Sequence, residues 1–157
     1  MIYHSISPKE TQKIAENLAV KITKSLVFSK PKEARVITLE GELGAGKTTF
    51  VQAFAKALGV KSKIKSPTFN ILKKYQIPNS SRFIYHIDCY RLKDHKEAVL
   101  IGIKEIFKEK GSIVLVEWPE RIKKILPKKL VLIHIDHIDK EKRKIQMEYS
   151  TRKCNMD

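Results

Sequence analysis

The sequence predicts a three-layer α/β fold with a mixed, mainly parallel central sheet, built by a single domain over residues 1–157. Two observations predict this class. Short apolar or alternating runs typical of strands are interspersed with stretches of helical periodicity, and one glycine-rich loop leads from such a strand directly into a helix. A chain of 157 residues is long enough for one continuous core and short for two, so no separate substrate domain is expected.

The first helix is expected to begin at Pro8. Ser7 and Glu10 have the spacing of a capping box, in which Ser7 caps the helix and Glu10 occupies its third position. Apolar residues then recur at every fourth position, at Ile14, Leu18, Ile22 and Leu26. This periodicity predicts an amphipathic helix that packs one stripe on the core.

The rest of the chain supplies the sheet and its connections. The pattern predicts a strand over 34–41, a helix over 47–59, a hairpin of 70–77 with 82–88, a broken helical stretch from Asp94 with an interruption at Gly102, a strand over 112–117, a short helix from Pro119, and two paired runs at 129–138 and 143–149. The hairpins make the sheet mixed. Residues 150–157 form a basic tail that is expected to fray.

The loop between the first strand and its helix has the spacing of a phosphate-binding loop. In ITLEGELGAGKTTF, residues 37–50, Gly41 is followed by four residues and then by Gly46, Lys47 and Thr48. Glycines allow successive backbone N–H groups to face one anion, and the helix presents its positive end to the same point. Lys47 would reach the β- and γ-phosphates, and the Thr48 hydroxyl would bind Mg²⁺. The sequence therefore predicts a P-loop nucleotide site.

Two acidic residues end neighbouring strands of the predicted sheet. IYHID ends at Asp88 and IVLVE ends at Glu117. Strand ends of this fold class face the ligand crevice, so both carboxylates are candidates for holding Mg²⁺ or positioning water. The sequence does not rank these two roles, and a surface carboxylate is the alternative for each.

Three further side chains, those of Thr68, Arg91 and Trp118, are candidates on weaker grounds. Thr68, in SPTF, stands where nucleotide switches place a threonine that senses the γ-phosphate, although Ser-Pro-Thr is also ordinary loop chemistry. Arg91 could neutralise phosphate charge, bind a partner or be a surface arginine. Trp118 directly follows Glu117, which favours a position beside the site. His86 is interpreted as a core histidine, and His134 and His137 are not expected to form a metal site.

Composition limits the class of protein. The formal charge of +15 favours encounter with a polyanion or an acidic protein surface, or reflects a lysine-rich solvated surface. The two cysteines, Cys89 and Cys154, have no metal or disulfide spacing and are expected to be free thiols. With no signal peptide and no long apolar run, the expected location is the cytoplasm. The absence of an N-K-x-D segment favours ATP over GTP.

Four motifs together resemble one family. GELGAGKTTF, SPTF, YHIDCYRL and VEWPERI, in this order and over about residues 5–135, are similar to the TsaE (YjeE) family of P-loop ATPases in bacterial tRNA threonylcarbamoyladenosine synthesis. The resemblance implies an ATPase that needs Mg²⁺, is slow alone and is activated by partners. It implies that TsaC makes threonylcarbamoyl-adenylate, that TsaD and TsaB transfer the group to tRNA, and that ATP binding and hydrolysis attach this protein to the TsaD–TsaB complex and reset it.

The resemblance also assigns residues. It implies that the ATP/ADP loop consists of Gly41, Glu42, Leu43, Gly44, Ala45, Gly46, Lys47, Thr48 and Thr49, with Trp118 and Arg91 beside it. It matches Thr68 to the switch threonine, and Asp88 and Glu117 to the two acidic positions needed for Mg²⁺ and hydrolysis.

Two rival functions are carried forward. A small P-loop kinase would need a lid and an acceptor pocket, for which residues 92–112 are short and broken. An ATP-gated RNA-binding module is the other, supported by the cluster of Lys61, Lys63 and Lys65. Direct contact with tRNA therefore stays open.

Overall fold

The computed structural model describes residues 1–27 and 32–151, with side chains described except at 25–27. Its elements, in chain order, are β1 (Ile2–Ser5), α1 (Pro8–Val27), β2 (Arg35–Glu40), α2 (Lys47–Ala57), β3 (Leu72–Gln76), β4 (Phe83–Asp88), α3 (His95–Leu100), α4 (Ile103–Ile106), β5 (Ile113–Glu117), the 3₁₀ helix η1 (Pro119–Ile122), β6 (Lys129–His137) and β7 (Arg143–Thr151).

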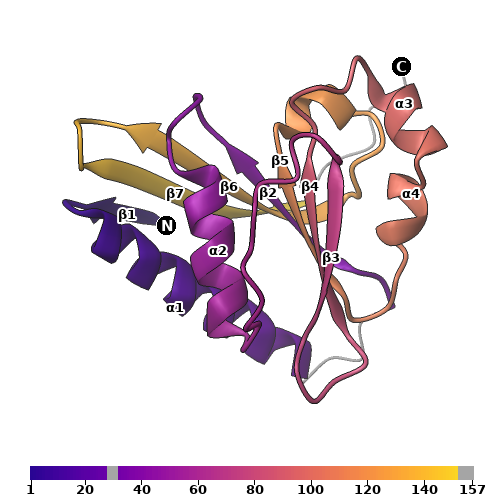
Figure 1. The fold of residues 1–157 in the computed structure, drawn as a ribbon, viewed down its shortest axis with the longest axis horizontal. Helices are drawn as coiled ribbons and strands as arrows, with labels where there is room; N and C mark the ends of the chain where they lie inside the picture. Colours follow the sequence, from indigo (N-terminus) through magenta and orange to yellow (C-terminus); the bar gives the residue numbers. More distant parts are fainter. Residues whose placement is uncertain (28–31, 152–157) are drawn as a thin grey trace.

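The strands form one mixed sheet in the order β1-β7-β6-β2-β5-β4-β3 (Figure 1). The four strands from β6 to β4 are parallel, and the pairings outside them are antiparallel. The predicted mixed α/β class is therefore confirmed, with the parallel pairings in the centre of the sheet and the hairpins at its edges. Strands β2, β5 and β4 lie side by side and run parallel, so their last residues meet at one edge of the sheet.

Helices cover both faces of the sheet, as the predicted three layers require. Helices α1 and α2 pack on one face, and α3, α4 and η1 pack on the other (Figure 1). Strand β5 shows the division: Leu115 belongs to the core under α2, whereas Val116 belongs to the core under α3. Successive side chains of a strand point to opposite faces, so a strand buried on both sides is apolar throughout.

Helix α1 begins at Pro8 as predicted. The Ser7 hydroxyl accepts the Glu10 backbone N–H at 3.3 Å, which is one half of a capping box. The Glu10 carboxylate accepts the N–H of Ile6, at 2.8 Å, and not that of Ser7. Of the predicted stripe, Leu18 and Ile22 are buried and Ile14 is partly buried, while the side chain of Leu26 lies outside the described residues.

Three details differ from the sequence prediction. Strand β1 was not anticipated; it pairs with β7 from Ile2 opposite Gln146 onward. The helical stretch expected after the interruption at Gly102, IKEIFKEKG, forms an α-helix only over Ile103–Ile106, which is α4. Ser150 and Thr151 were expected to fray, but they pair with Leu130 and Lys129 of β6 as the last residues of β7. The antiparallel partner supplies the backbone hydrogen bonds that the sequence pattern alone did not reveal. The remaining tail lies outside the described residues.

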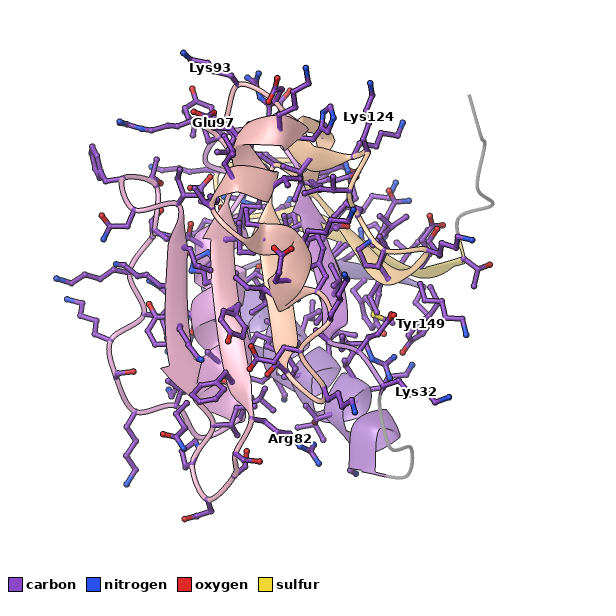
Figure 2. All side chains as sticks on the ribbon, turned by 90° about the vertical axis from the view of Figure 1, so that its right-hand side faces the viewer. Lys32, Arg82, Lys93, Glu97, Lys124 and Tyr149 are labelled. Atoms are coloured by element: carbon purple, nitrogen blue, oxygen red, sulfur yellow. The ribbon has the colours of Figure 1, made fainter. Side chains whose placement is uncertain are left out.

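The surface carries the positive charge of the chain. Figure 2 shows side chains such as those of Lys93 and Lys124 extending from the surface, where both are exposed. In the part of the chain that the structure describes, no helix has the length and apolar character to cross a bilayer.

Candidate functional site

The loop between β2 and α2 surrounds open space. Gly44 and Gly46 have φ angles of +80° and +101°, and a Cβ atom added to either would meet nothing within 4 Å. The first helical hydrogen bond of α2 runs from Phe50 to Gly46, so the N–H groups of the residues before Phe50 have no acceptor within the helix. These N–H groups and the positive end of α2 fit an anion such as a phosphate.

Two contacts fix the base of this loop. Gly41 has a φ of +143°, and a Cβ there would run into the backbone carbonyl oxygen of Ile135 on β6. Only glycine permits this approach. On the other side, Arg143 Nε donates to the Ala45 carbonyl oxygen at 3.0 Å. The loop therefore contacts both β6, through Gly41, and β7, through Arg143.

Lys47, the first residue of α2, lies across the loop. Its buried ammonium donates to the carbonyl oxygens of Gly41 and Glu42 at 2.7 and 2.8 Å. The same Nζ lies 4.2 Å from the centre of the Trp118 ring, within the range of a cation–π contact. The predicted phosphate-binding lysine is thus inside the loop that would hold the phosphates.

The charge of Lys47 responds to its surroundings. Burial lowers the pKa of its ammonium from the ordinary value of 10.5, and the carboxylates of Glu117, Asp88 and Glu120 partly oppose this. An anion placed beside the ammonium would favour its charged form in the same way.

Glu117 and Thr48 meet at the end of the sheet. Strand β5 runs beside β2, which brings the last residue of β5 to the start of α2. The Thr48 hydroxyl donates to the buried Glu117 carboxylate, at 3.0 Å to one oxygen and 3.3 Å to the other. Two predicted site residues from distant segments are therefore in direct contact.

Asp88 and Thr68 form a second pair next to the first. Asp88 is paired in register with Glu117 across β4 and β5. One oxygen of the Asp88 carboxylate accepts the Thr68 hydroxyl at 2.7 Å, and the other accepts the backbone N–H of Tyr90 at 3.0 Å. The SPTF loop is thereby held against the same edge of the sheet.

These groups line one cavity of about 360 Å³. The residues that line it are Leu43, Gly44, Gly46, Lys47, Thr48, Thr49, Ser66, Thr68, Asp88, Tyr90, Glu117 and Trp118. Hydroxyl and carboxylate oxygens are the ligands that Mg²⁺ prefers, usually together with water and phosphate oxygens. Within the described ranges no three His, Cys, Asp or Glu side chains form a cage for a metal. The donor set therefore fits a hard cation that shares its ligands with a nucleotide.

Trp118 is one of the side chains that line this cavity. Its backbone is left-handed, with a φ of +57°, where η1 begins. The half-buried ring packs against Tyr90, with ring centres 5.1 Å apart, and against the Lys47 ammonium. The sequence order favoured a position beside the site for Trp118, and the structure places its ring there.

Arg91 points elsewhere. Its guanidinium lies 4.4 Å from the centre of the Phe69 ring, and both side chains are exposed. Arg91 is not among the residues that line the cavity. The Arg91 guanidinium therefore packs against Phe69 of the SPTF loop and does not line the cavity beside the P-loop.

His86 is buried, as the core interpretation expected, but it also reaches the site. Its Nε2 lies 2.7 Å from a carboxylate oxygen of Glu117. Sequence reasoning missed this contact. The signal was the spacing, because His86 and Asp88 lie two residues apart on one face of β4.

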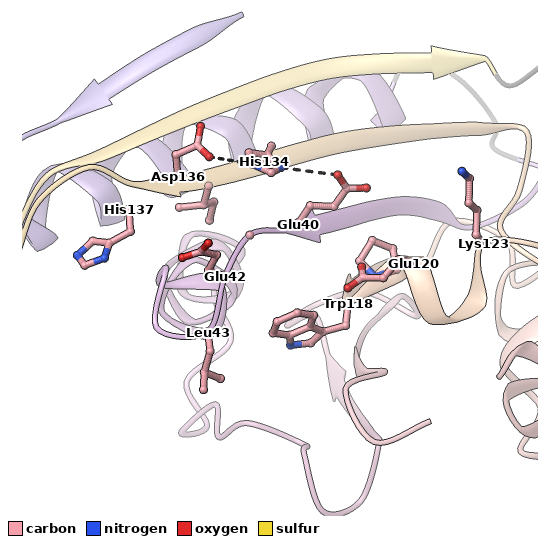
Figure 3. A pocket seen from close by; sticks show the side chains of 12 residues that line it. Glu40, Glu42, Leu43, Trp118, Glu120, Lys123, His134, Asp136 and His137 are labelled. Carbon is pink, nitrogen blue, oxygen red and sulfur yellow. Dashed lines mark hydrogen bonds and ion pairs between the residues drawn. The ribbon is translucent and has the colours of Figure 1, made fainter. Parts of the chain in front are cut away.

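A second cavity, of about 740 Å³, adjoins the loop on the side of β6 (Figure 3). Carboxylates of Glu40, Glu42, Glu120 and Asp136 line it, together with the imidazole of His134. Nε2 of His134 lies 2.9 Å from Asp136, and Nδ1 lies 3.7 Å from Glu40. The sequence did not reveal this acidic wall, because its members come from three separate segments.

Comparison with known proteins identifies the family. The model of the family described as threonylcarbamoyl adenosine biosynthesis protein TsaE matches residues 5–145. The tRNA threonylcarbamoyladenosine biosynthesis protein TsaE of Bacillus subtilis strain 168 is 39% identical over 91% of this chain and 82% of its own length. That of Aquifex aeolicus is 38% identical over 90% of both chains.

A solved structure agrees with these relatives. The crystal structure of Bacillus subtilis YdiB superposes with a TM-score of 0.72 at 32% sequence identity, covering 97% of this chain and 86% of YdiB. The fold, the converging motifs and the sequence relatives lead to one conclusion: the chain belongs to the TsaE family of tRNA threonylcarbamoyladenosine biosynthesis proteins.

Proposed function

We propose that this protein binds ATP with Mg²⁺ and hydrolyses it to support turnover of the TsaD–TsaB complex in tRNA threonylcarbamoyladenosine synthesis. The observation that carries the proposal is the convergence of two hydroxyl–carboxylate pairs, Thr48 with Glu117 and Thr68 with Asp88, on one phosphate-binding loop. Such an arrangement suits phosphoryl chemistry, where catalysis is mostly positioning and charge stabilisation.

The loop would hold the phosphates. Backbone N–H groups of the first turn of α2 donate to phosphate oxygens, and the Lys47 ammonium exchanges the carbonyl oxygens of Gly41 and Glu42 for the β- and γ-phosphates. That exchange uses an ammonium already inside the loop, so only its side chain has to move.

The two pairs would divide the remaining work. Thr48 and Glu117, which lie closest to the start of α2, hold the metal and its waters. Bound Mg²⁺ would neutralise charge on the phosphate oxygens. Asp88, fixed by Thr68 and the N–H of Tyr90, accepts a hydrogen bond from the attacking water and orients it.

The Thr68–Asp88 contact would also sense the nucleotide. Thr68 belongs to a loop that carries the exposed Phe69, so a change at the γ-phosphate is transmitted to the surface. In this proposal the SPTF loop adjusts attachment to TsaD–TsaB between the ATP and ADP states.

The larger cavity would take the sugar and base. It shares Leu43 and Trp118 with the smaller one, so a nucleotide can extend from one into the other. Its carboxylates repel phosphate but accept hydrogen bonds from ribose hydroxyls and amino groups. This orientation keeps the phosphates at α2.

Steady-state ATP hydrolysis tests the proposal. The purified protein is assayed alone and with TsaD–TsaB from the same source, and Lys47→Ala serves as the blank. A weak basal rate that the partners raise, with the variant remaining flat, supports the proposed role. A rate that the partners leave unchanged contradicts the action on that complex.

The kinase alternative receives no support from the fold. The segment 92–112, which would have to form a lid, contributes Leu92, Ala98 and Ile103 to the core under α3 and α4. A segment fixed in this way is not free to close over an acceptor.

A second candidate, direct contact with tRNA, rests on a cavity of about 590 Å³ at the end of α2. Lys56, Lys61 and Lys63 line it, so it offers several ammonium groups to phosphates. If tRNA binds there, its affinity for the isolated protein falls steeply as salt rises, and Lys61→Ala with Lys63→Ala reduces that salt dependence. Binding without salt dependence excludes this mode.

A further inference from the structure

One buried polar group close to the site has no part in the proposed nucleotide chemistry. His86 is fully buried, and its Nε2 lies 2.7 Å from Oε1 of Glu117. Its other ring nitrogen, Nδ1, has no hydrogen-bond partner among the described residues. Because a carboxylate only accepts, the ring donates from Nε2 and leaves Nδ1 as a bare acceptor. Among the described residues, the hydrogen bond to Glu117 is therefore the one polar contact of the His86 ring.

The sheet aims this donor at the site. Strands β4 and β5 are parallel neighbours, and His86 is in register with Leu115, two residues before Glu117. Side chains two residues apart share a face, so His86 lies on the same face of the sheet as Glu117, one strand over and two residues back from the strand end. The fully buried ring thus reaches from the core to the carboxylate at the end of the neighbouring strand.

The same carboxylate oxygen has two donors. Oε1 of Glu117 lies 2.7 Å from His86 Nε2 and 3.0 Å from the Thr48 hydroxyl. The two donors come from different elements: His86 from strand β4 and Thr48 from the P-loop helix α2. A core residue selected for stability alone would be apolar here, because a buried imidazole with one unsatisfied nitrogen is unfavourable.

We propose that His86 is a positioning residue: it holds the Glu117 carboxylate at the P-loop so that Glu117 and Thr48 together receive the metal of the nucleotide complex. When the Thr48 hydroxyl turns to the metal, the bond from His86 remains and prevents the carboxylate from rotating. This inference rests on the proposed Mg²⁺–nucleotide function. Outer partners of this kind typically change metal affinity 10- to 100-fold when removed.

Trp118 provides a readout that does not depend on turnover. It is the only tryptophan of the chain and contacts Lys47 at the site, so its fluorescence reports ADP binding. Titrating Mg²⁺ at a fixed ADP concentration then measures metal affinity without hydrolysis. The variant His86→Leu removes the donor while filling the ring's space, and His86→Gln offers an amide N–H in its place.

The expected result separates metal from phosphate binding. His86→Leu weakens Mg²⁺ affinity about 10-fold or more. ADP affinity without Mg²⁺ stays near that of the wild type, because the loop and Lys47 hold the phosphates. His86→Gln recovers part of the loss. Thr38→Val is the matched control: Thr38 is equally buried, its hydroxyl also lacks a partner in the described chain, and it faces the opposite core on β2. It leaves Mg²⁺ affinity unchanged.

Several outcomes overturn the inference. If folded His86→Leu binds Mg²⁺ as the wild type does, or if His86→Gln loses as much affinity as His86→Leu, the donor has no positioning role. If wild-type fluorescence shows no Mg²⁺-dependent ADP binding, the proposed function fails and the inference falls with it. Thermal unfolding of each variant shows which of them are folded.

A measurement on the intact protein covers the case in which His86→Leu does not fold. Nuclear magnetic resonance of ¹⁵N-labelled histidine identifies which ring nitrogen carries the proton. The expected signature is an imidazole protonated at Nε2 whose signal shifts in Glu117→Gln and when Mg²⁺ joins the ADP complex. A proton on Nδ1 alone, or a signal insensitive to both changes, overturns the assignment.

Discussion

The hydroxyl oxygen of Thr48 lies 3.0 Å from a carboxylate oxygen of Glu117, although 69 residues separate the two in the chain. The contact exists because β2 and β5 are parallel neighbours, so that the end of one strand faces the helix that follows the other. It joins the phosphate-binding loop to the acidic edge of the sheet.

Thr48→Ala removes the hydroxyl at the proposed metal position. We expect Mg²⁺-dependent ATP hydrolysis to fall at least about 10-fold, because a direct ligand is lost, whereas Thr48→Ser keeps the hydroxyl and most of the rate. The measurement is hydrolysis as a function of Mg²⁺ concentration. Equal rates for the alanine and serine variants would show that the hydroxyl is not used.

Lys47→Ala removes the ammonium from the loop. Nucleotide binding is expected to become undetectable by Trp118 fluorescence or calorimetry, because the buried cation is the charged group that faces the phosphates. Lys56→Ala is the matched control, since Lys56 is an exposed lysine at the other end of the same helix. Similar losses in both variants would point to the overall positive charge, not to the loop.

Asp88→Asn and Glu117→Gln test the acidic edge. Both substitutions preserve size and remove a charge, so turnover should fall far more than ATP affinity, as for groups that act chiefly in the transition state. Hydrolysis rates and binding constants are measured on the same preparations. An affinity that declines in full parallel with turnover in both variants contradicts the roles assigned to these carboxylates.

Much of this site was predictable because each segment carries a local signal. The glycine spacing before Lys47 predicts a loop, and strands that end at Asp88 and Glu117 predict acids at one edge. Parallel pairing then brings these signals together, since all three strands point the same way. The mixed sheet followed from the hairpins that alternate with helical segments.

Other features depend on contacts that no single segment encodes. The bond from His86 to Glu117 requires the register of two strands, and the burial of Nδ1 requires the whole core around it. Strand β1 is stable through β7, which lies at the other end of the chain. The exposed stacking of Arg91 on Phe69 likewise depends on how the SPTF loop folds back.

Gly41→Ala tests the packing beneath the loop. A methyl group at this position runs into the carbonyl oxygen of Ile135, whereas Gly44→Ala meets no atom within 4 Å. Both glycines have positive φ, so each variant carries backbone strain, and the contact with Ile135 is a further cost at Gly41 alone. Gly41→Ala should lower the free energy of unfolding by about 1–3 kcal/mol more than Gly44→Ala. Urea denaturation measures this; equal losses would mean that the backbone yields freely.

Cys89 follows Asp88 directly, yet the structure excludes it from nucleophilic chemistry. The thiol is fully buried, and burial raises its pKa from 9.0 to about 12, with the carboxylates of Asp88, Glu120 and Glu117 adding to the effect. A raised thiol pKa means that the reactive thiolate is depleted at every pH below about 12. At pH 8 the thiolate is therefore much scarcer in the native protein than in unfolded chains, whose thiol has its ordinary pKa.

The prediction concerns the rate of thiol modification. In a Cys154→Ser background, where Cys89 is the one remaining cysteine, a maleimide or disulfide reagent should not react with the native protein at pH 8 over minutes. It should react promptly once denaturant exposes the thiol, because both access and the ordinary pKa return. Rapid modification of the native protein would show that the β4 end opens in solution, and that Asp88 is then less firmly held than its contacts with Thr68 and Tyr90 imply.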